Sequence, residues 1–98
     1  METALLKCSL ADVINKLKEI LLQQGFLIEK FDLKNKEVMA YQNGNWYRNP
    51  KHILFELSPV DNNLTRIDVT ASLETKKKNR KAEEVIEEKI VSIIYNYF

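Results

Sequence analysis

The chain contains one histidine, His52, and one cysteine, Cys8, and these side chains are the best suited to bind a metal ion or attack a substrate. A zinc site needs three or four ligands, which one histidine and one cysteine in different elements do not supply. A nucleophilic cysteine needs a paired base, and the spacing of Cys8 and His52 carries no such signature. The sequence predicts no catalytic residue, metal site or cofactor. We interpret Cys8 as a small buried thiol and His52 as a strand-edge residue.

Other common catalytic and phosphate-binding patterns are also missing from the sequence. A phosphate-binding loop needs several closely spaced glycines, and the chain has only Gly25 and Gly44. Acidic residues near the C-terminal end recur at i, i+4 on one helix surface, which suits a solvated face rather than a catalytic pair. These residues are Glu83, Glu84, Glu87 and Glu88.

A run of positive charge precedes the last predicted helix. Its members are Lys76, Lys77, Lys78, Arg80 and Lys81. Cations at this end of a helix oppose the positive pole of the helix dipole, so their placement is locally unfavourable. Two interpretations remain open: contact with an anionic partner such as nucleic acid, phospholipid or an acidic protein, or a solvated loop offset by the glutamates that follow. The balanced charge of the whole chain favours the solvated loop.

Length and composition indicate one globular domain over residues 1–98. The chain has 45% hydrophobic and 30% charged residues, and its formal net charge of +1 creates no global field that attracts nucleic acid. A single cysteine excludes an internal disulfide and favours a reducing compartment. Residues 1–10 lack the apolar stretch of a secretory signal, and no apolar run is long enough to span a membrane. These features predict a cytoplasmic protein.

The clearest predicted element is a helix that starts after Ser9. Ser9 and Asp12 have the spacing of a capping box, and Gly25 suits the left-handed position that ends a helix, with Phe26 packing back on the last turn. Its apolar stripe is Leu10, Val13, Ile14, Leu17, Ile20 and Leu21. A second helix is expected from about residue 79 to the C-terminus. Its apolar stripe is Ala82, Val85, Ile86, Ile90, Ile93, Ile94 and Tyr97.

Strands are expected at residues 3–8, 26–33, 37–43, 52–58 and 64–73, and the first of these is short. Alternating apolar and polar residues in the last two indicate an antiparallel sheet that is covered on one side only. Asn43 and Gly44 suit a tight hairpin turn. The economical arrangement is an α+β two-layer sandwich, an antiparallel sheet of four to five strands with both helices on one face. Without the first strand, a simpler sandwich of helix, four strands and helix remains.

The predicted order is strand, helix, four strands, helix. The chain resembles one repeat of the TATA-box-binding-protein-like fold, also called helix-grip. The resemblance rests on this order of elements and on the Ser9 cap, the Gly25-Phe26 helix exit and the Asn43-Gly44 turn. The resemblance implies a curved sheet gripped by two helices across nearly the whole chain. A likeness of fold carries no activity by itself.

The uncovered face of the sheet is the main candidate interface. If the first two long strands keep a regular register, it carries an apolar patch of Phe31, Met39, Tyr41 and Leu54. The register of residues 26–33 is ambiguous, because Phe26, Ile28 and Phe31 cannot share one face without a bulge. Outward positions of the last two strands include Glu56 and Asp68, with only Arg66 opposing them, which is the wrong charge for a polyanion.

The sequence therefore predicts a non-enzymatic protein-binding or assembly module that contacts its partner, a second protein or another copy of itself, through the open sheet face. The alternative is an accessory nucleic-acid-binding module that uses the basic run, with Trp46, Tyr47 and Arg48 for stacking. An enzyme or small-ligand carrier is disfavoured, because so small a sandwich is expected to have little spare volume.

Overall fold

The computed structural model describes residues 1–43, 50–74 and 80–98. The elements are β1 (Glu2–Leu6), α1 (Leu10–Gln23), β2 (Leu27–Asp32), β3 (Glu37–Gln42), β4 (Lys51–Asp61), β5 (Leu64–Leu73) and α2 (Arg80–Tyr97). The strands form one sheet in the order β1-β5-β4-β3-β2, and every neighbouring pair is antiparallel. The predicted α+β class and element order are confirmed, including the short first strand.

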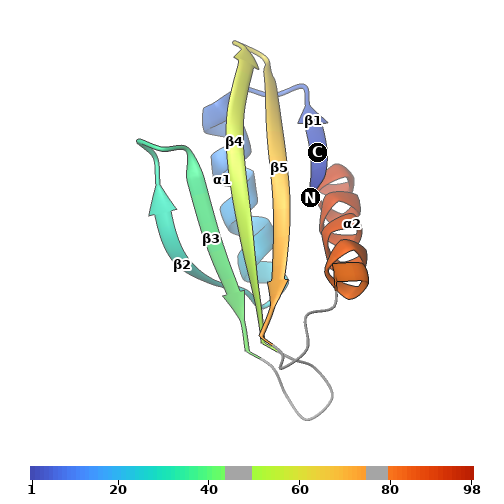
Figure 1. The fold of residues 1–98 in the computed structure, drawn as a ribbon. Coiled ribbons are helices and arrows are strands. Elements are labelled where there is room, and N and C mark those ends of the chain that lie inside the picture. Colours follow the sequence, from blue (N-terminus) through green and yellow to red (C-terminus); the bar gives the residue numbers. More distant parts are fainter. Residues whose placement is uncertain (44–49, 75–79) are drawn as a thin grey trace.

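The helices lie together on one side of the sheet (Figure 1). Alternate residues of β3, β4 and β5 point toward them, and in β4 these are Ile53, Phe55 and Leu57, of which no side chain is more than 4% exposed. In β5 the buried positions include Ile67 and Val69. The core is thus the layer between one sheet face and the helices, as the alternation predicts. No segment among the described residues covers the other face.

Helix α1 begins and ends as its sequence predicts. The Ser9 side chain accepts a hydrogen bond from the Asp12 amide at 3.3 Å. Gly25 has a φ of 81°, and the Phe26 amide donates back to the Leu21 carbonyl at 2.9 Å. These bonds satisfy carbonyls that the end of the helix would leave unpaired. Phe26 is thereby turned into the core, and β2 starts at the next residue.

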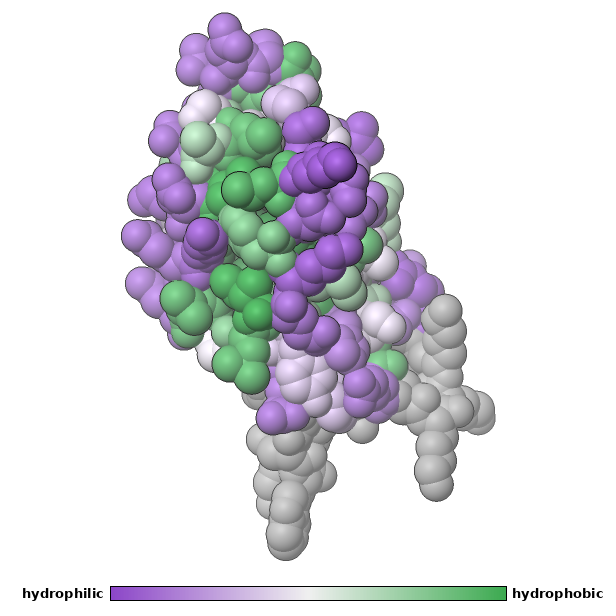
Figure 2. All heavy atoms as spheres, turned by 90° about the vertical axis from the view of Figure 1, so that its left-hand side faces the viewer, coloured by the Kyte–Doolittle hydropathy of each residue, from purple (hydrophilic) through white to green (hydrophobic). Residues whose placement is uncertain are grey.

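A β-bulge changes the direction of side chains in β2. Its register against β3 shifts between Ile28 and Lys30, so that Ile28 lies opposite Ala40 and Phe31 lies opposite Val38. Ile28 and Phe31 therefore both point toward the covered face and pack against the core. Figure 2 views the molecule from the β2 side and shows a band of hydrophobic side chains between hydrophilic margins.

The prediction that Phe31 belongs to the open face is wrong. An unbulged strand alternates strictly, and the extra residue moves Phe31 to the opposite side. The Lys18 ammonium of α1 lies 4.2 Å from the centre of the Phe31 ring, a cation–π contact that covers the ring from the helix side.

Helix α2 differs from its predicted orientation in its first half. Ile90 and Ile94 are buried as expected, but Val85 is 58% exposed, while Glu83 and Glu87 are almost fully buried. The prediction that these glutamates form a solvated face is therefore wrong for Glu83 and Glu87. Glu84 and Glu88 are exposed.

The buried glutamates continue the edge of the sheet where β1 stops. β1 pairs with β5 only as far as Val69. Beyond it, the Ala71 amide donates to Glu87 at 2.7 Å and the Leu73 amide donates to Glu83 at 3.0 Å. Buried backbone amides need an acceptor, and α2 supplies it from its side chains. This requirement sets the rotation of the first half of α2.

Positive groups compensate the buried Glu87 carboxylate. Arg80 donates to its two oxygens at 2.7 and 2.9 Å, and the Met1 ammonium lies 2.7 Å away. Burial by itself raises the pKa of Glu87, but the hydrogen bonds from Met1, Ala71 and Arg80 lower it below the ordinary value. The carboxylate is therefore charged and fully paired inside the protein.

Candidate functional site

The open face of the sheet has half-buried apolar side chains at its centre. Met39 of β3 lies directly opposite Leu54 of β4, and Leu54 lies opposite Thr70 of β5. Tyr41 is two residues after Met39 in β3 and therefore lies on the same face. Leu27 of β2 lies opposite Tyr41, and 62% of the surface of Leu27 is exposed. Three of the four predicted interface residues, Met39, Tyr41 and Leu54, are thus brought together, and Leu27 extends the group. We call Leu27, Met39, Tyr41 and Leu54 the apolar centre.

His52 lies next to this centre and is held by carboxylates on both sides. Its Nδ1 atom is 2.8 Å from Glu29, and its Nε2 atom is 2.6 Å from Glu74. The Tyr41 ring packs beside the imidazole, with 4.8 Å between the ring centres. His52 therefore connects β2 and the end of β5 across the sheet, whereas the sequence suggested only a strand-edge residue.

The charge state of His52 follows from these contacts. The hydrogen bond with Glu74 is the largest cause raising the pKa of His52, burial opposes the rise, and the bond with Glu29 adds to it. When the ring is protonated it donates both N–H groups to carboxylates, and neither nitrogen then offers a lone pair to a metal or a substrate proton. Within residues 1–43, 50–74 and 80–98, no group of three or more His, Cys, Asp or Glu side chains is arranged to hold a metal ion.

A row of acidic residues crosses the open face beside the apolar centre. Neighbouring strands place these carboxylates in line, Asp32 of β2, Glu37 of β3, Glu56 of β4 and Asp68 of β5. Lys30 lies 3.8 Å from Asp32 and 3.9 Å from Glu37. Arg66 lies 3.1 Å from Asp68. With Glu29 and Glu74, the described face has more carboxylates than cations, so its local charge is negative although the whole chain is almost neutral.

The proposed anion-binding residues are not brought together as one free basic surface. Arg80 is the first residue of α2, and its partly exposed side chain is paired with Glu83 and Glu87. Arg80 as an anion contact stays a prediction, and these carboxylates would compete with any anion for its guanidinium. Lys81 is exposed. Lys76, Lys77 and Lys78 of the basic run, and Trp46, Tyr47 and Arg48 of the proposed stacking group, lie outside the described residues.

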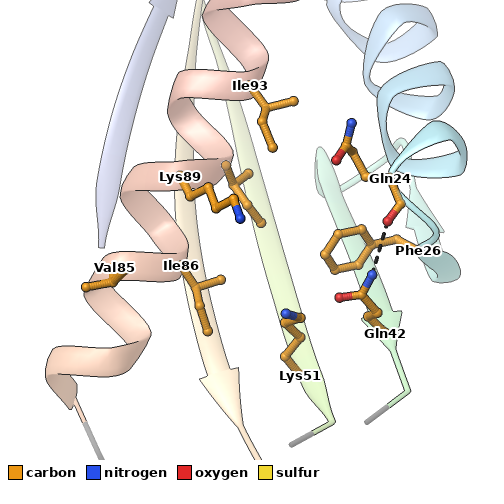
Figure 3. Close-up of a pocket in the computed structure, with 9 residues that line it drawn as sticks. Gln24, Phe26, Gln42, Lys51, Val85, Ile86, Lys89 and Ile93 are labelled. Atoms are coloured by element: carbon orange, nitrogen blue, oxygen red, sulfur yellow. Dashed lines mark hydrogen bonds between the residues drawn. The ribbon is translucent and has the colours of Figure 1, made fainter. Parts of the chain in front are cut away.

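A cleft lies on the covered side of the sheet, where the sequence led us to expect little spare volume. It measures about 290 Å³ and lies between α2 and the sheet, near the end of α1 (Figure 3). Its lining residues are Gln24, Phe26, Gln42, Lys51, Val85, Ile86, Lys89, Ile90 and Ile93. The cleft exists because α2 turns Glu83 and Glu87 toward β5. This rotation leaves Val85 and Ile86 on the side of α2 that lines the cleft.

Sequence reasoning missed Glu29 and Glu74 as partners of His52. No local pattern marks them, because the three residues are far apart in the chain and meet only through the strand order and the β2 bulge. The cleft was missed for a related reason, since it depends on the rotation of α2.

Comparison with known proteins adds no family. No protein-family model matches the chain, and no curated protein is similar enough to be called a relative. No helix in the described part of the chain combines the length and the apolar character needed to cross a membrane. The fold itself is an open antiparallel sheet with helices on one face.

Proposed function

We propose that this chain is a non-enzymatic protein-binding or assembly module whose partner docks on the open sheet face. The observation that carries the proposal is the cross-strand pair of Met39 and Leu54, which lies half-buried at the middle of a face that no described segment covers. Interfaces commonly have such an apolar middle surrounded by charged and polar residues. A partner that covers Met39, Leu54 and the exposed Leu27 would remove apolar surface from water.

The charge of the face indicates the chemistry of the partner. The acidic row and the carboxylates around His52 favour a protein that presents lysine or arginine around an apolar contact. A second copy of this chain is a weaker candidate, because two identical acidic faces brought together by two-fold symmetry would repel each other. A nucleic acid is weaker still, because its phosphates carry the same sign of charge.

We also propose that the chain is a TATA-box-binding-protein-like repeat in a reducing cytoplasmic compartment. The strand order β1-β5-β4-β3-β2 with both helices on one face supports the first part, and the single Cys8 supports the second. Neither statement supplies an activity.

The test compares capture of partners by the parent protein and by Leu54→Asp. The tagged proteins are incubated with extract of the source cells, and bound proteins are identified and quantified. Val60→Asp is the matched control, because Val60 is an exposed apolar residue of the same strand outside the apolar centre. Circular dichroism checks that each variant is folded.

We expect one specific protein partner that binds the parent and Val60→Asp equally and binds Leu54→Asp at least about tenfold less. Salt should release a part of the bound partner, because it screens the charges that contribute to the contact. Equal capture by all three proteins, or no specific partner for any of them, would overturn the proposal. Recovery of nucleic acid alone would indicate that the partner is a nucleic acid and not a basic protein. A stable homodimer of the parent that is lost in Leu54→Asp would indicate that the partner is a second copy of the chain.

A further inference from the structure

The cleft between α2 and the sheet has apolar walls and a base formed by the core. Figure 3 shows Phe26 pointing across the space toward α2, with Ile86 and Ile93 reaching toward it from the helix. Phe26 and Ile90 are nearly buried, at 7% and 8% exposure. The apolar side chains are therefore fixed by the fold and need no large rearrangement to receive a ligand.

The charged side chains that line these walls are all positive among the described residues. Lys51 and Lys89 line the cleft, and none of its described lining residues is acidic. Lys89 is exposed and belongs to none of the ion pairs formed among the described residues. Gln42 also lines the cleft, and its Nε2 atom donates to the Gln24 carbonyl at 3.1 Å, which orients the amide (Figure 3). Lys89 thus places a positive charge beside the apolar walls of the cleft.

We infer that this cleft binds a small amphipathic carboxylate, with its apolar body against Phe26, Ile86 and Ile93 and its carboxylate beside Lys89. Positive side chains at an apolar wall complement a molecule that has an anionic head and a hydrocarbon body. The volume of about 290 Å³ lies just below the range of small-molecule pockets, which run from about 300 to 1,000 Å³, so the ligand is small. This site is on the opposite side of the sheet from the proposed protein interface and does not depend on it.

The test is an NMR titration of ¹⁵N-labelled protein with octanoate, octanol and acetate. Octanoate and octanol have the same chain, so their difference measures the contribution of the carboxylate. Acetate measures the contribution of the charge without the chain. Lys89→Gln removes the proposed contact for the head group, and Ile86→Trp fills the apolar space. Lys34→Gln is the control, because Lys34 is an exposed lysine in the turn between β2 and β3.

We expect octanoate to shift the amide signals of Phe26, Ile86 and Ile93 and to bind more tightly than octanol, with no detectable binding of acetate. Lys89→Gln should weaken octanoate binding by roughly two- to fivefold, the range of an exposed ion pair, and leave octanol unchanged. Lys34→Gln should bind both like the parent, and Ile86→Trp should bind neither.

Three results would overturn the inference. The first is that octanoate and octanol bind the parent protein with equal affinity. The second is that Lys34→Gln and Lys89→Gln weaken octanoate binding equally, and the third is that the signal changes are confined to residues outside the cleft. Because Lys89 is exposed, Lys89→Gln keeps the test decisive even if Ile86→Trp does not fold.

Discussion

The Glu87 carboxylate of α2 accepts a hydrogen bond from the Ala71 amide of β5 at 2.7 Å, in the position where a longer β1 would offer a backbone carbonyl. A helix side chain thus completes the edge of the sheet. The same carboxylate is paired with Arg80, so one buried residue joins the start of α2 to the end of β5.

This arrangement predicts that Glu87→Ala is strongly destabilising. The variant leaves the Ala71 amide without its acceptor and Arg80 without its main partner, which should cost about 2–4 kcal/mol of unfolding free energy. Glu88→Ala is the matched control, because Glu88 is an exposed glutamate one position along the same helix, and its cost should stay within about 0.5 kcal/mol. Urea denaturation measures both values, and equal transition midpoints would show that the Glu87 contacts contribute nothing.

A second prediction concerns the left-handed backbone of Gly25. A Cβ atom built there would have only an ordinary contact, 3.6 Å from the Gln42 amide nitrogen, so space is available and the cost is conformational. Gly25→Ala should therefore lower the unfolding free energy by about 1 kcal/mol or more. Gly25→Asn should cost less, because asparagine tolerates a positive φ better. If denaturation gave the same stability for the parent and Gly25→Ala, the helix exit described above would be incorrect.

The third prediction follows from the raised pKa of His52. Its folded-state pKa is above the ordinary value of about 6.5, so the contacts with Glu74 and Glu29 contribute stability that is fully present below that pH. This contribution is lost as the pH rises through the folded-state pKa. The difference in unfolding free energy between the parent and His52→Asn should therefore become smaller on going from about pH 6 to about pH 9, the two values chosen to bracket the titration of His52.

An NMR titration of the His52 ring supplies the direct reading of this prediction. The chain has only one histidine, so the imidazole signals need no assignment by mutation. Glu29→Gln should lower the pKa of His52, and Glu74→Gln should lower it more, because the bond to Glu74 is the larger cause. A pKa at or below about 6.5 in the parent would contradict the arrangement of the three side chains.

The elements with strong local signals could be predicted from sequence. The Ser9 cap, the Gly25 exit and the apolar stripe between them determine α1 because each acts within a few residues. The alternation in β4 and β5 likewise identifies the covered face. Both kinds of pattern record burial of the chain against a single neighbouring layer.

Features that depend on distant pairing could not be predicted in the same way. A bulge in β2 determines which face of the sheet Phe31 occupies. The sequence shows only that Phe26, Ile28 and Phe31 cannot share one face without such a bulge. The burial of Glu83 and Glu87 depended on where β1 stops along β5, which no local pattern records. The contact of His52 with Glu29 required both the strand order and the bulge.

The most direct test of the open-face interface uses the methionine methyl groups. The chain has only Met1 and Met39, so labelling with ¹³C-methyl methionine gives a reporter at the apolar centre and a reference immediately before β1. The partner captured by the parent protein is added, and both methyl signals are followed by NMR. We predict that the Met39 signal shifts or broadens in proportion to the bound fraction while the Met1 signal stays in place. A bound complex in which Met39 is unchanged would contradict the proposal that the open sheet face is the interface.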